Sequence, residues 1–288
     1  DMGWTDIGFT ALLAAGLTAC ADKAGPQLQR CVELKTALKL NEAVVTCKAA
    51  VAADATSKAG RSAAAVLGEL ERAKRAADQD AAHGFALWDG KRAAKNPAEA
   101  KQVFDRACKQ GSALGCGGVG ISLLDGIDGT GMDYAGALAQ LKPACEAKVA
   151  RACSALGSMH LQGTGVPKDQ AAAAPLFMRA CDAGEPRGCV GLGMMYQAGA
   201  GGLPKDQARG LKLIQQACDA ELPAACWALS NAYFMGLGTP KEPGLAAKFG
   251  HRACDGGDGD GCLRWASALT SGEGADKDPP AAFSAAQK

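Results

Sequence analysis

Cysteine is the residue type with the clearest capacity for chemistry in this chain. The 288 residues include 13 cysteines, and ten of them fall into five pairs with seven residues between the two members of each pair. Cysteines spaced in this way form disulfides, bind a metal ion or remain as free thiols. The ten cysteines are Cys108 and Cys116, Cys145 and Cys153, Cys181 and Cys189, Cys218 and Cys226, and Cys254 and Cys262.

The composition favours disulfides over the other two chemistries. Zinc sites usually combine Cys-x-x-Cys clusters with histidine, but this chain has no such cluster and only His83, His160 and His251. Buried thiols remain an alternative, because Cys packs as a small apolar residue. A count of 13 cysteines, however, is far above that of a usual intracellular protein of this length. We therefore expect the protein to lie in an oxidising compartment outside the cytoplasm. We also expect it to have neither a metal site nor a cofactor.

The cysteine pairs belong to a tandem repeat with a period of 36 or 37 residues. An alanine precedes the first Cys of every pair, and a glycine follows the second Cys by ten residues. That glycine can end a helix, because it has no Cβ to oppose the left-handed conformation. A period near this length is typical of stacked helix–turn–helix units. Each unit is therefore predicted to contain one helix ending at the first Cys and another starting near the second.

Turn residues separate the predicted units. Pro167, Pro204 and Pro240 are each followed by lysine and then an acidic residue. Proline fits the first turn of a helix, where its missing N–H is not needed, and an acid suits the positive end of the helix dipole. These prolines are therefore expected to lie in the first helical turn.

The charge balance and the motifs exclude several function classes. With 31 basic and 30 acidic residues, the chain has no global attraction to nucleic acid or to a membrane surface. No Gly-x-Ser-x-Gly, His-Glu-x-x-His or phosphate-binding loop is present. We therefore predict no catalytic residues and no nucleic-acid partner.

Two stretches of the third unit resemble the Sel1-like repeat family, particularly its cysteine-rich type known from Helicobacter. The stretches are Ala180-Cys181-Asp182-Ala183-Gly184 and Gly188-Cys189-Val190-Gly191-Leu192-Gly193. The resemblance extends over five units, residues 97–272. It implies an all-α, right-handed superhelical solenoid of antiparallel helix pairs, similar to tetratricopeptide arrays. It also implies one intra-repeat disulfide per unit, between the two cysteines of each pair.

The remaining segments are expected to be helical caps. Residues 1–60 are predicted to form an N-terminal cap or extension, with a hairpin over 27–53. Residues 61–96 are predicted to form an atypical hairpin whose helices cover 63–77 and 81–94. Residues 273–288 are predicted to form a C-terminal capping tail, because the terminal units of solenoids are often atypical.

Cys20, Cys31 and Cys47 lie outside the repeat. The stretch Leu17-Thr18-Ala19-Cys20 resembles a bacterial lipobox, which makes residues 1–20 a candidate leader and Cys20 a candidate lipidation site, and leaves Cys31 to pair with Cys47. The alternative is a packed N-terminal helix with Cys20 bonded to Cys31 or Cys47, because no Lys or Arg precedes the apolar run. Membrane association is expected only if Cys20 is lipidated, since the run is too short to span a bilayer.

The resemblance implies binding along the concave face, which the first helix of each unit lines. A loosely basic stripe is predicted on the helices that end at the first cysteines, and a peptide with acidic groups or a free carboxylate would fit it. An ordinary solvated surface is the alternative. The stripe residues are Gln102, Arg106, Arg179, Lys212, Gln216, Lys248 and Arg252.

Three functions follow from the resemblance. The first is a noncatalytic scaffold that holds a protein or peptide in the bacterial periplasm, on the outer membrane or outside the cell, with the mitochondrial intermembrane space as the alternative compartment. The second is a binder of β-lactam or peptidoglycan-type ligands, or a weak β-lactamase. The chain has no Ser-x-x-Lys, Lys-Thr-Gly or Ser-Asp-Asn to support that activity. The third is a structural subunit of a bacterial surface assembly.

Overall fold

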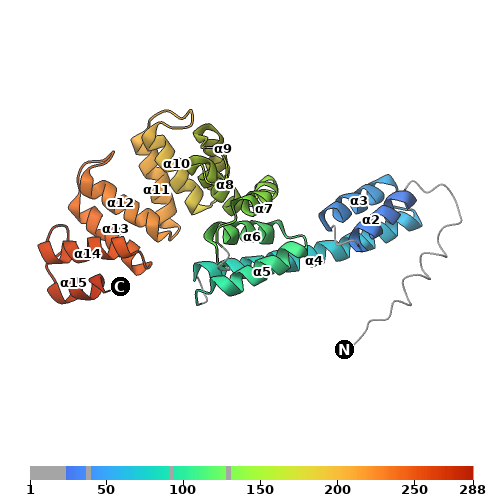
Figure 1. The fold of residues 1–288 in the computed structure, drawn as a ribbon, viewed down its shortest axis with the longest axis horizontal. Coiled ribbons are helices and arrows are strands. Elements are labelled where there is room, and N and C mark those ends of the chain that lie inside the picture. The colour runs from blue at the N-terminus through green and yellow to red at the C-terminus, as the bar shows by residue number, and fades with distance from the viewer. Residues whose placement is uncertain (1–23, 37–39, 91–93, 128–130, 288) are drawn as a thin grey trace. The chain divides into compact units, whose positions relative to one another are not determined.

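The computed structural model of the chain describes residues 24–36, 40–90, 94–127 and 131–287. Every regular element in these ranges is a helix, and none is a strand, so the predicted all-α class is confirmed. The helices, labelled in Figure 1, are α2 (Gly25–Thr36), α3 (Leu40–Ala53), α4 (Lys58–Asp89), α5 (Pro97–Lys109), α6 (Ala113–Asp125), α7 (Tyr134–Glu146), α8 (Ala150–Gln162), α9 (Gln170–Asp182), α10 (Pro186–Ala198), α11 (Gln207–Asp219), α12 (Pro223–Met235), α13 (Pro243–Asp255), α14 (Gly259–Ser271) and α15 (Pro279–Ala286).

The chain divides into two compact units. In the described part of the first unit, α2, α3 and the start of α4 surround a small core that contains Leu34, Leu70 and a disulfide between Cys31 and Cys47. This bridge excludes the expectation that Cys20 is bonded to one of these two cysteines. Cys20 and the candidate leader 1–20 lie outside the described residues.

The predicted hairpin over 61–96 is wrong, because one helix, α4, runs without interruption from Lys58 to Asp89. The segment between the two predicted helices, residues 78–80, contains neither glycine nor proline. Nothing there breaks the backbone hydrogen-bond pattern, and the alanines around it favour helix. The chain first leaves the helix at Gly90, whose φ of 70° is the left-handed conformation that glycine adopts easily.

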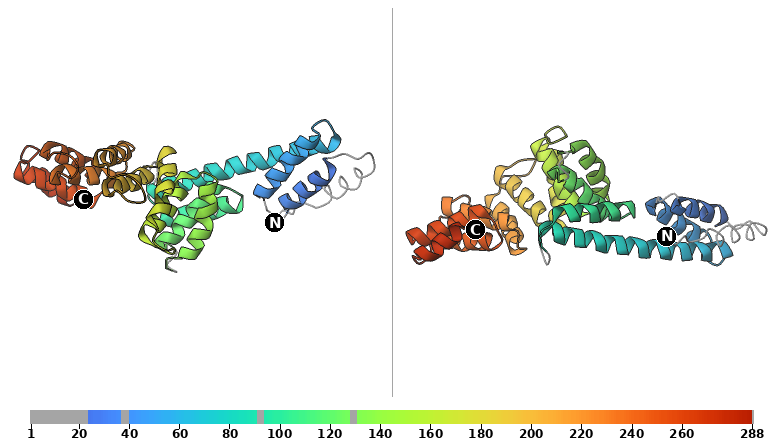
Figure 2. Two further views of the ribbon diagram at one scale, coloured as in Figure 1. Left: turned by 90° about the horizontal axis from the view of Figure 1, so that it is seen from above. Right: turned by 60° about the horizontal axis from the view of Figure 1, so that its bottom comes forward.

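The second unit begins at residue 81 and contains the repeats. Helices of 13 residues follow one another as antiparallel pairs from α5 to α14, which Figure 2 shows from green to red. Alternate helices also touch, since α8 contacts both α6 and α10, and α12 contacts α14. The last helix, α15, packs on α14 within the segment predicted to be a capping tail. No helix in the described ranges is both long enough and apolar enough to cross a bilayer.

The helix ends of the second unit explain the repeated turn residues. Gly163, Gly199 and Gly236 end their helices in the left-handed conformation, as predicted. The position predicted for the prolines is wrong, however: Pro167 and Pro204 lie two residues before the N-caps Asp169 and Asp206. Each of these aspartates accepts a hydrogen bond from a backbone N–H of the first helical turn. The acid side chain, and not the proline, therefore caps the helix.

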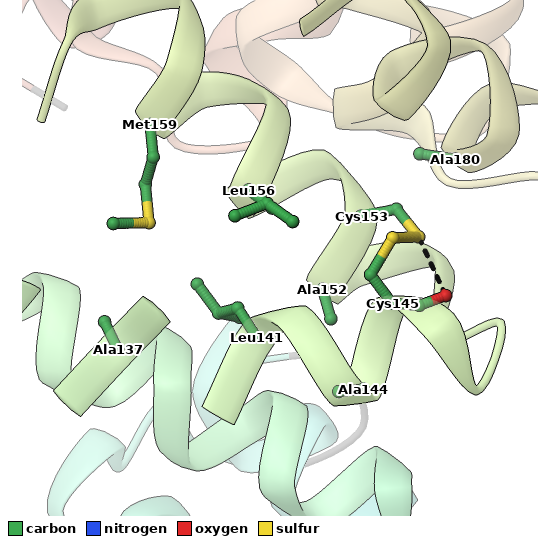
Figure 3. Close-up of a cluster of buried hydrophobic side chains, with 9 residues drawn as sticks. All are labelled: Ala137, Leu141, Ala144, Cys145, Ala152, Cys153, Leu156, Met159 and Ala180. Carbon is green, nitrogen blue, oxygen red and sulfur yellow. Dashed lines mark hydrogen bonds between the residues drawn. A yellow bond between two sulfur atoms is a disulfide. The ribbon is translucent and has the colours of Figure 1, made fainter. Parts of the chain in front are cut away.

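The core of the second unit consists mainly of small side chains, with few large ones. Figure 3 shows one layer, in which Leu141 and Met159 meet Leu156 beside the bridge between Cys145 and Cys153. Phe104 and Phe177 are fully enclosed, because helices on both sides of each ring carry glycine where a larger side chain would clash. The helices therefore fill the core by packing close to one another and not by burying many large side chains.

Candidate functional site

The five repeat disulfides join the two helices of each hairpin at one end. Their Cα atoms are 4.5, 4.6, 4.5, 4.7 and 4.3 Å apart, in chain order. Each bridge is within one hairpin, so the predicted pairing is confirmed. In the pair drawn in Figure 3, Cys153 Sγ also lies 3.5 Å from the carbonyl oxygen of Cys145. The bridges hold the short turns between paired helices in a fixed position.

The predicted basic stripe lies on α5, α9, α11 and α13, and six of its seven side chains are exposed, while Arg252 is partly buried. Two of its arginines bind the preceding repeat. Arg179 Nη2 donates to the carbonyl oxygen of Cys145 at 2.7 Å, and Arg252 Nη2 donates to that of Cys218 at 3.0 Å. Each acceptor belongs to the last turn of a helix, where carbonyl groups lack partners within the helix. These two arginines therefore connect successive hairpins.

Replacing Arg179 with glutamine is expected to lower the free energy of unfolding by about 1 kcal/mol. The change removes a charge-assisted hydrogen bond to a helix end, and the partial exposure of the bond keeps its contribution small. Urea unfolding followed by circular dichroism measures the loss. Lys212→Gln removes an exposed cation from α11 and serves as the control. Equal stability of the two variants would contradict the role of Arg179.

The second unit contains a groove of about 570 Å³. It lies at the ends of six helices: the last turn of α4, the first turns of α8, α10 and α12, and the last turns of α11 and α13. Only Arg252 of the predicted stripe reaches it. The lining residues are Asp89, Gly90, Arg151, Glu185, Pro186, Arg187, Cys218, Ala220, Glu221, Leu222, Pro223, Cys226, Arg252, Asp255 and Gly256.

A network of ion pairs forms part of the groove lining. Arg151 donates to Asp89 at 2.7 Å and to Glu185 at 3.4 Å, while its guanidinium lies 4.4 Å from the centre of the Phe85 ring. Arg187 is more loosely placed, with its nearest atoms 3.8 Å from Asp89 and 4.0 Å from Glu185. The Glu185 side chain is only 8% exposed, and the two arginines supply its ion-pair partners.

The rest of the groove lining comes from the turn between α11 and α12 and from the end of α13. Arg252 Nη1 lies 3.1 Å from Asp219 Oδ1. A hydrogen bond from Gln215, followed by the interaction with Arg252, holds the pKa of Asp219 below its ordinary value. Asp219 is therefore ionised at neutral pH and holds Arg252 at the end of α13.

Glu221, in the turn between α11 and α12, has a backbone conformation that is unusual for its residue type. Its φ is 60°, in the left-handed region, and the equivalent residues of three other repeats are Gly111, Gly184 and Gly257. Lys148 is the other exception, with φ 67°. This conformation costs a residue with a Cβ about 1–2 kcal/mol. The interrupted glycine column was visible in the sequence and could have identified Glu221.

Residues that could bind a metal ion are not clustered in the described part of the chain. No three His, Cys, Asp or Glu side chains gather there in a way that could hold a metal ion. Charged groups of both signs line the groove, an arrangement suited to recognition of a partner by charge.

Comparison with known proteins supports the repeat architecture. A family model described as Sel1 repeat matches residues 81–112, 150–185, 186–222, 223–258 and 259–284, which is more than half of the chain. The later matched segments begin with α8, α10, α12 and α14. The starts of the first helices of three matched segments thus line the groove together with the ends of α11 and α13, whereas the predicted stripe lies on second helices. A search of curated proteins found no match.

Similar solved structures come from several bacteria. The c5321 protective antigen of uropathogenic Escherichia coli is 26% identical with a TM-score of 0.55, over 76% of this chain and 48% of the antigen. The chain thus spans about half the length of that protein. A Sel1 repeat protein from Oxalobacter formigenes is 20% identical with a TM-score of 0.58, over 93% of this chain and 96% of its own. The immunity protein Pa5087 of Pseudomonas aeruginosa is 15% identical with a TM-score of 0.52, over 73% of this chain and 81% of its own.

Proposed function

Because the chain belongs to the Sel1 repeat family, a family of scaffolds associated with protein–protein interaction, we propose that it binds a protein or peptide partner in the groove of its second unit. The observation that carries the proposal is the groove itself, which lies at the ends of six helices and is lined by charged side chains from four of them and from two turns. Solenoids bind partners along the surface that successive repeats form together. The groove has this composite character, because no single hairpin could make it.

We place this activity outside the reducing cytosol. Twelve of the 13 cysteines are disulfide-bonded, and such bridges persist only where thiols are oxidised. The bacterial periplasm, the outer membrane or the secreted space are the preferred compartments, with the mitochondrial intermembrane space as the alternative. The basic stripe remains a second candidate surface, at the exposed residues that do not bind the preceding repeat: Gln102, Arg106, Lys212, Gln216 and Lys248.

Site-specific photocrosslinking tests where the partner binds. A benzoylphenylalanine placed at Ala220 reports on the groove, and one placed at Gln102 reports on the stripe; both positions are exposed. With the envelope fraction of the native host, we expect a discrete crosslinked product from Ala220 and none from Gln102. A product from Gln102 alone would move the binding surface to the stripe. The absence of any product at both positions would overturn the proposal of a protein partner.

A further inference from the structure

We infer that a hollow on α11 is a second binding site, which takes an acidic side chain of a peptide segment through Arg209 and Lys212. The inference goes beyond the proposed function and does not depend on it, because no residue lines both this hollow and the groove. Three observations support it: the lining of the hollow, the fixed position of Arg209, and the lack of an acid partner for either cation in the described part of the chain.

The hollow has a volume of about 510 Å³ and follows α11 from its N-cap to Gln216. Arg209, Lys212 and Gln216 are spaced by three or four residues, so their side chains share one face of the helix. Lys212 and Gln216 belong to the predicted basic stripe, whereas Arg209 does not. The lining residues are Asp206, Ala208, Arg209, Lys212, Leu213 and Gln216.

Two glycines allow α10 and α11 to approach closely. A Cβ at Gly210 would lie 2.6 Å from the carbonyl oxygen of Gly193, and a Cβ at Gly193 would lie 2.8 Å from that of Gly210. At the equivalent contacts of the other repeats, at least one of the two residues carries a side chain. Those pairs are Gly120 and Ala137, Gly157 and Ala173, Ser230 and Ala246, and Ala266 and Ala282. The contact between α10 and α11 is thus the one of the five in which neither backbone carries a Cβ.

Arg209, the neighbour of Gly210, lies over the ring of Tyr196 on α10. Its guanidinium carbon is 4.3 Å from the centre of that ring, and Tyr196 is only 3% exposed, so the ring is a fixed support. A guanidinium on an aromatic face can still donate the N–H groups at its edge to both oxygens of a carboxylate. Because the ring already restricts the side chain, less conformational entropy is lost when a carboxylate binds.

Neither cation of the hollow is paired with an acid among the residues that the structure describes. The acid of the lining, Asp206, is the N-cap of α11 and accepts a hydrogen bond from the backbone N–H of Arg209 at 2.9 Å. The three arginines of the groove differ, because each of them contacts a carboxylate of the chain. Arg209 and Lys212 are therefore available to an acidic group from a partner.

Apolar groups adjoin the two cations, since Ala208 and Leu213 also line the hollow. Charge complementarity and these apolar contacts select a segment in which an acidic residue stands beside an apolar one. All the lining residues come from one helix and its N-cap, so the lining includes no second element against which a chain terminus would end. The acid is therefore an internal aspartate or glutamate of the partner, and not its C-terminal carboxylate.

Three variants separate the effect of charge from that of geometry. Arg209→Gln removes the charge, and Arg209→Lys keeps a cation but loses the planar guanidinium that lies on Tyr196. Arg106→Gln, the control, removes an exposed arginine of α5 that lies outside the hollow. Because both positions are exposed, each variant should melt within about 2 °C of the wild type. A change in binding then cannot be attributed to loss of the fold.

The binding test follows the backbone amide signals of residues 208–216 in proton–nitrogen correlation spectra of the full chain. The probe is a hexapeptide, blocked at both ends, with a leucine and a glutamate between alanines. A second blocked peptide carries glutamine in place of the glutamate, and a third has this neutral sequence with a free C-terminal carboxylate.

We expect only the glutamate peptide to shift these signals in a saturable way. Its dissociation constant should be about three- to fivefold higher for Arg209→Gln, about twofold higher for Arg209→Lys and unchanged for Arg106→Gln. Added salt should weaken binding, because both cations are exposed.

Four results would overturn the inference. If the glutamate peptide causes no saturable shift, or if the blocked glutamine peptide causes the same shift, the hollow does not recognise an acidic side chain. An unchanged dissociation constant for Arg209→Gln would remove Arg209 from recognition. Equal or tighter binding of the peptide with the free carboxylate would assign the hollow to a chain terminus. None of these results bears on the groove, which the crosslink at Ala220 tests separately.

Discussion

Complete reduction of the disulfides is expected to lower the melting temperature of the second unit by roughly 20 °C or more. Each repeat bridge closes a short loop, with a sequence separation of 8 residues. A loop of this length contributes about 2–3 kcal/mol by the chain-entropy model, so five bridges contribute on the order of 10 kcal/mol. For a unit of this size, 1 kcal/mol shifts the melting temperature by about 2–4 °C.

The composition of the core makes the chain sensitive to this loss. Many of the buried positions at helix contacts are alanine, such as Ala137, Ala152 and Ala180, and a side chain of that size removes little apolar area from water. The bridges therefore supply a large share of the net stability. In a solenoid, moreover, each repeat contacts only its neighbours, so a loosened hairpin also weakens the two hairpins beside it.

Differential scanning fluorimetry with and without a phosphine reductant measures the shift, and thiol counting of the denatured chain establishes the starting state. Before reduction, at most Cys20 should react, because the other twelve cysteines are bridged. The variant Cys31→Ser/Cys47→Ser is the control, since it opens the bridge of the first unit and leaves the repeat bridges intact. An unchanged melting temperature after verified reduction would show that helix packing alone stabilises the repeats.

The hairpins and their bridges were predictable because they are local. The repeat period, the paired cysteines and the C-cap glycines all act over fewer than 40 residues, a range within which tandem copies reveal themselves by comparison with one another. The same comparison misplaced Pro167 and Pro204, because a proline two residues before an N-cap and a proline in the first turn have similar sequence patterns. The prediction also failed at α4, where residues 78–80 contain neither glycine nor proline to separate the two predicted helices.

The groove could not be predicted in the same way. Its ion pairs join residues that are far apart in sequence, such as Asp89 and Arg151, and neither residue is repeated at the equivalent position of every unit. A stripe drawn along equivalent positions assumes that each side chain points to solvent. The structure instead shows Arg179 and Arg252 bound to the preceding repeat. A repeated residue in the sequence is thus a good indication of a position that stabilises the array. It is a poorer indication of a position that binds a partner.

Within each hairpin, the volumes of two facing residues compensate one another, and this yields a second prediction with a large expected effect. The residue four before the first Cys faces the residue two after the second Cys, and a large side chain at one position accompanies a small one at the other. The five pairs are Phe104 and Gly118, Leu141 and Ala155, Phe177 and Gly191, Ile214 and Ala228, and Gly250 and Arg264. A Cβ added at Gly191 would lie 2.5 Å from the Phe177 ring, and one added at Gly250 would lie 2.9 Å from Arg264 Cγ.

We therefore expect Gly191→Ala alone to lower the free energy of unfolding by about 1–3 kcal/mol, because it forces the ring of Phe177 out of place. Phe177→Leu alone should cost a similar amount by leaving a cavity, since Phe177 is 2% exposed. The double variant reproduces the natural pair of Leu141 and Ala155, so it should be more stable than the sum of the two losses predicts, by at least about 1 kcal/mol. It should not regain full stability, because the same ring also packs against Gly157, where leucine leaves a gap.

A double-mutant cycle by urea unfolding measures this coupling. Gly191→Ala combined with Leu269→Ala, a core truncation in α14, is the matched control, and these two losses should add because the residues share no partner in the core. Additive losses for Phe177→Leu and Gly191→Ala would mean that the five residue pairs do not reflect direct packing. In that case the alternation of large and small side chains along the repeats would need a cause other than the contact between the two helices of each hairpin.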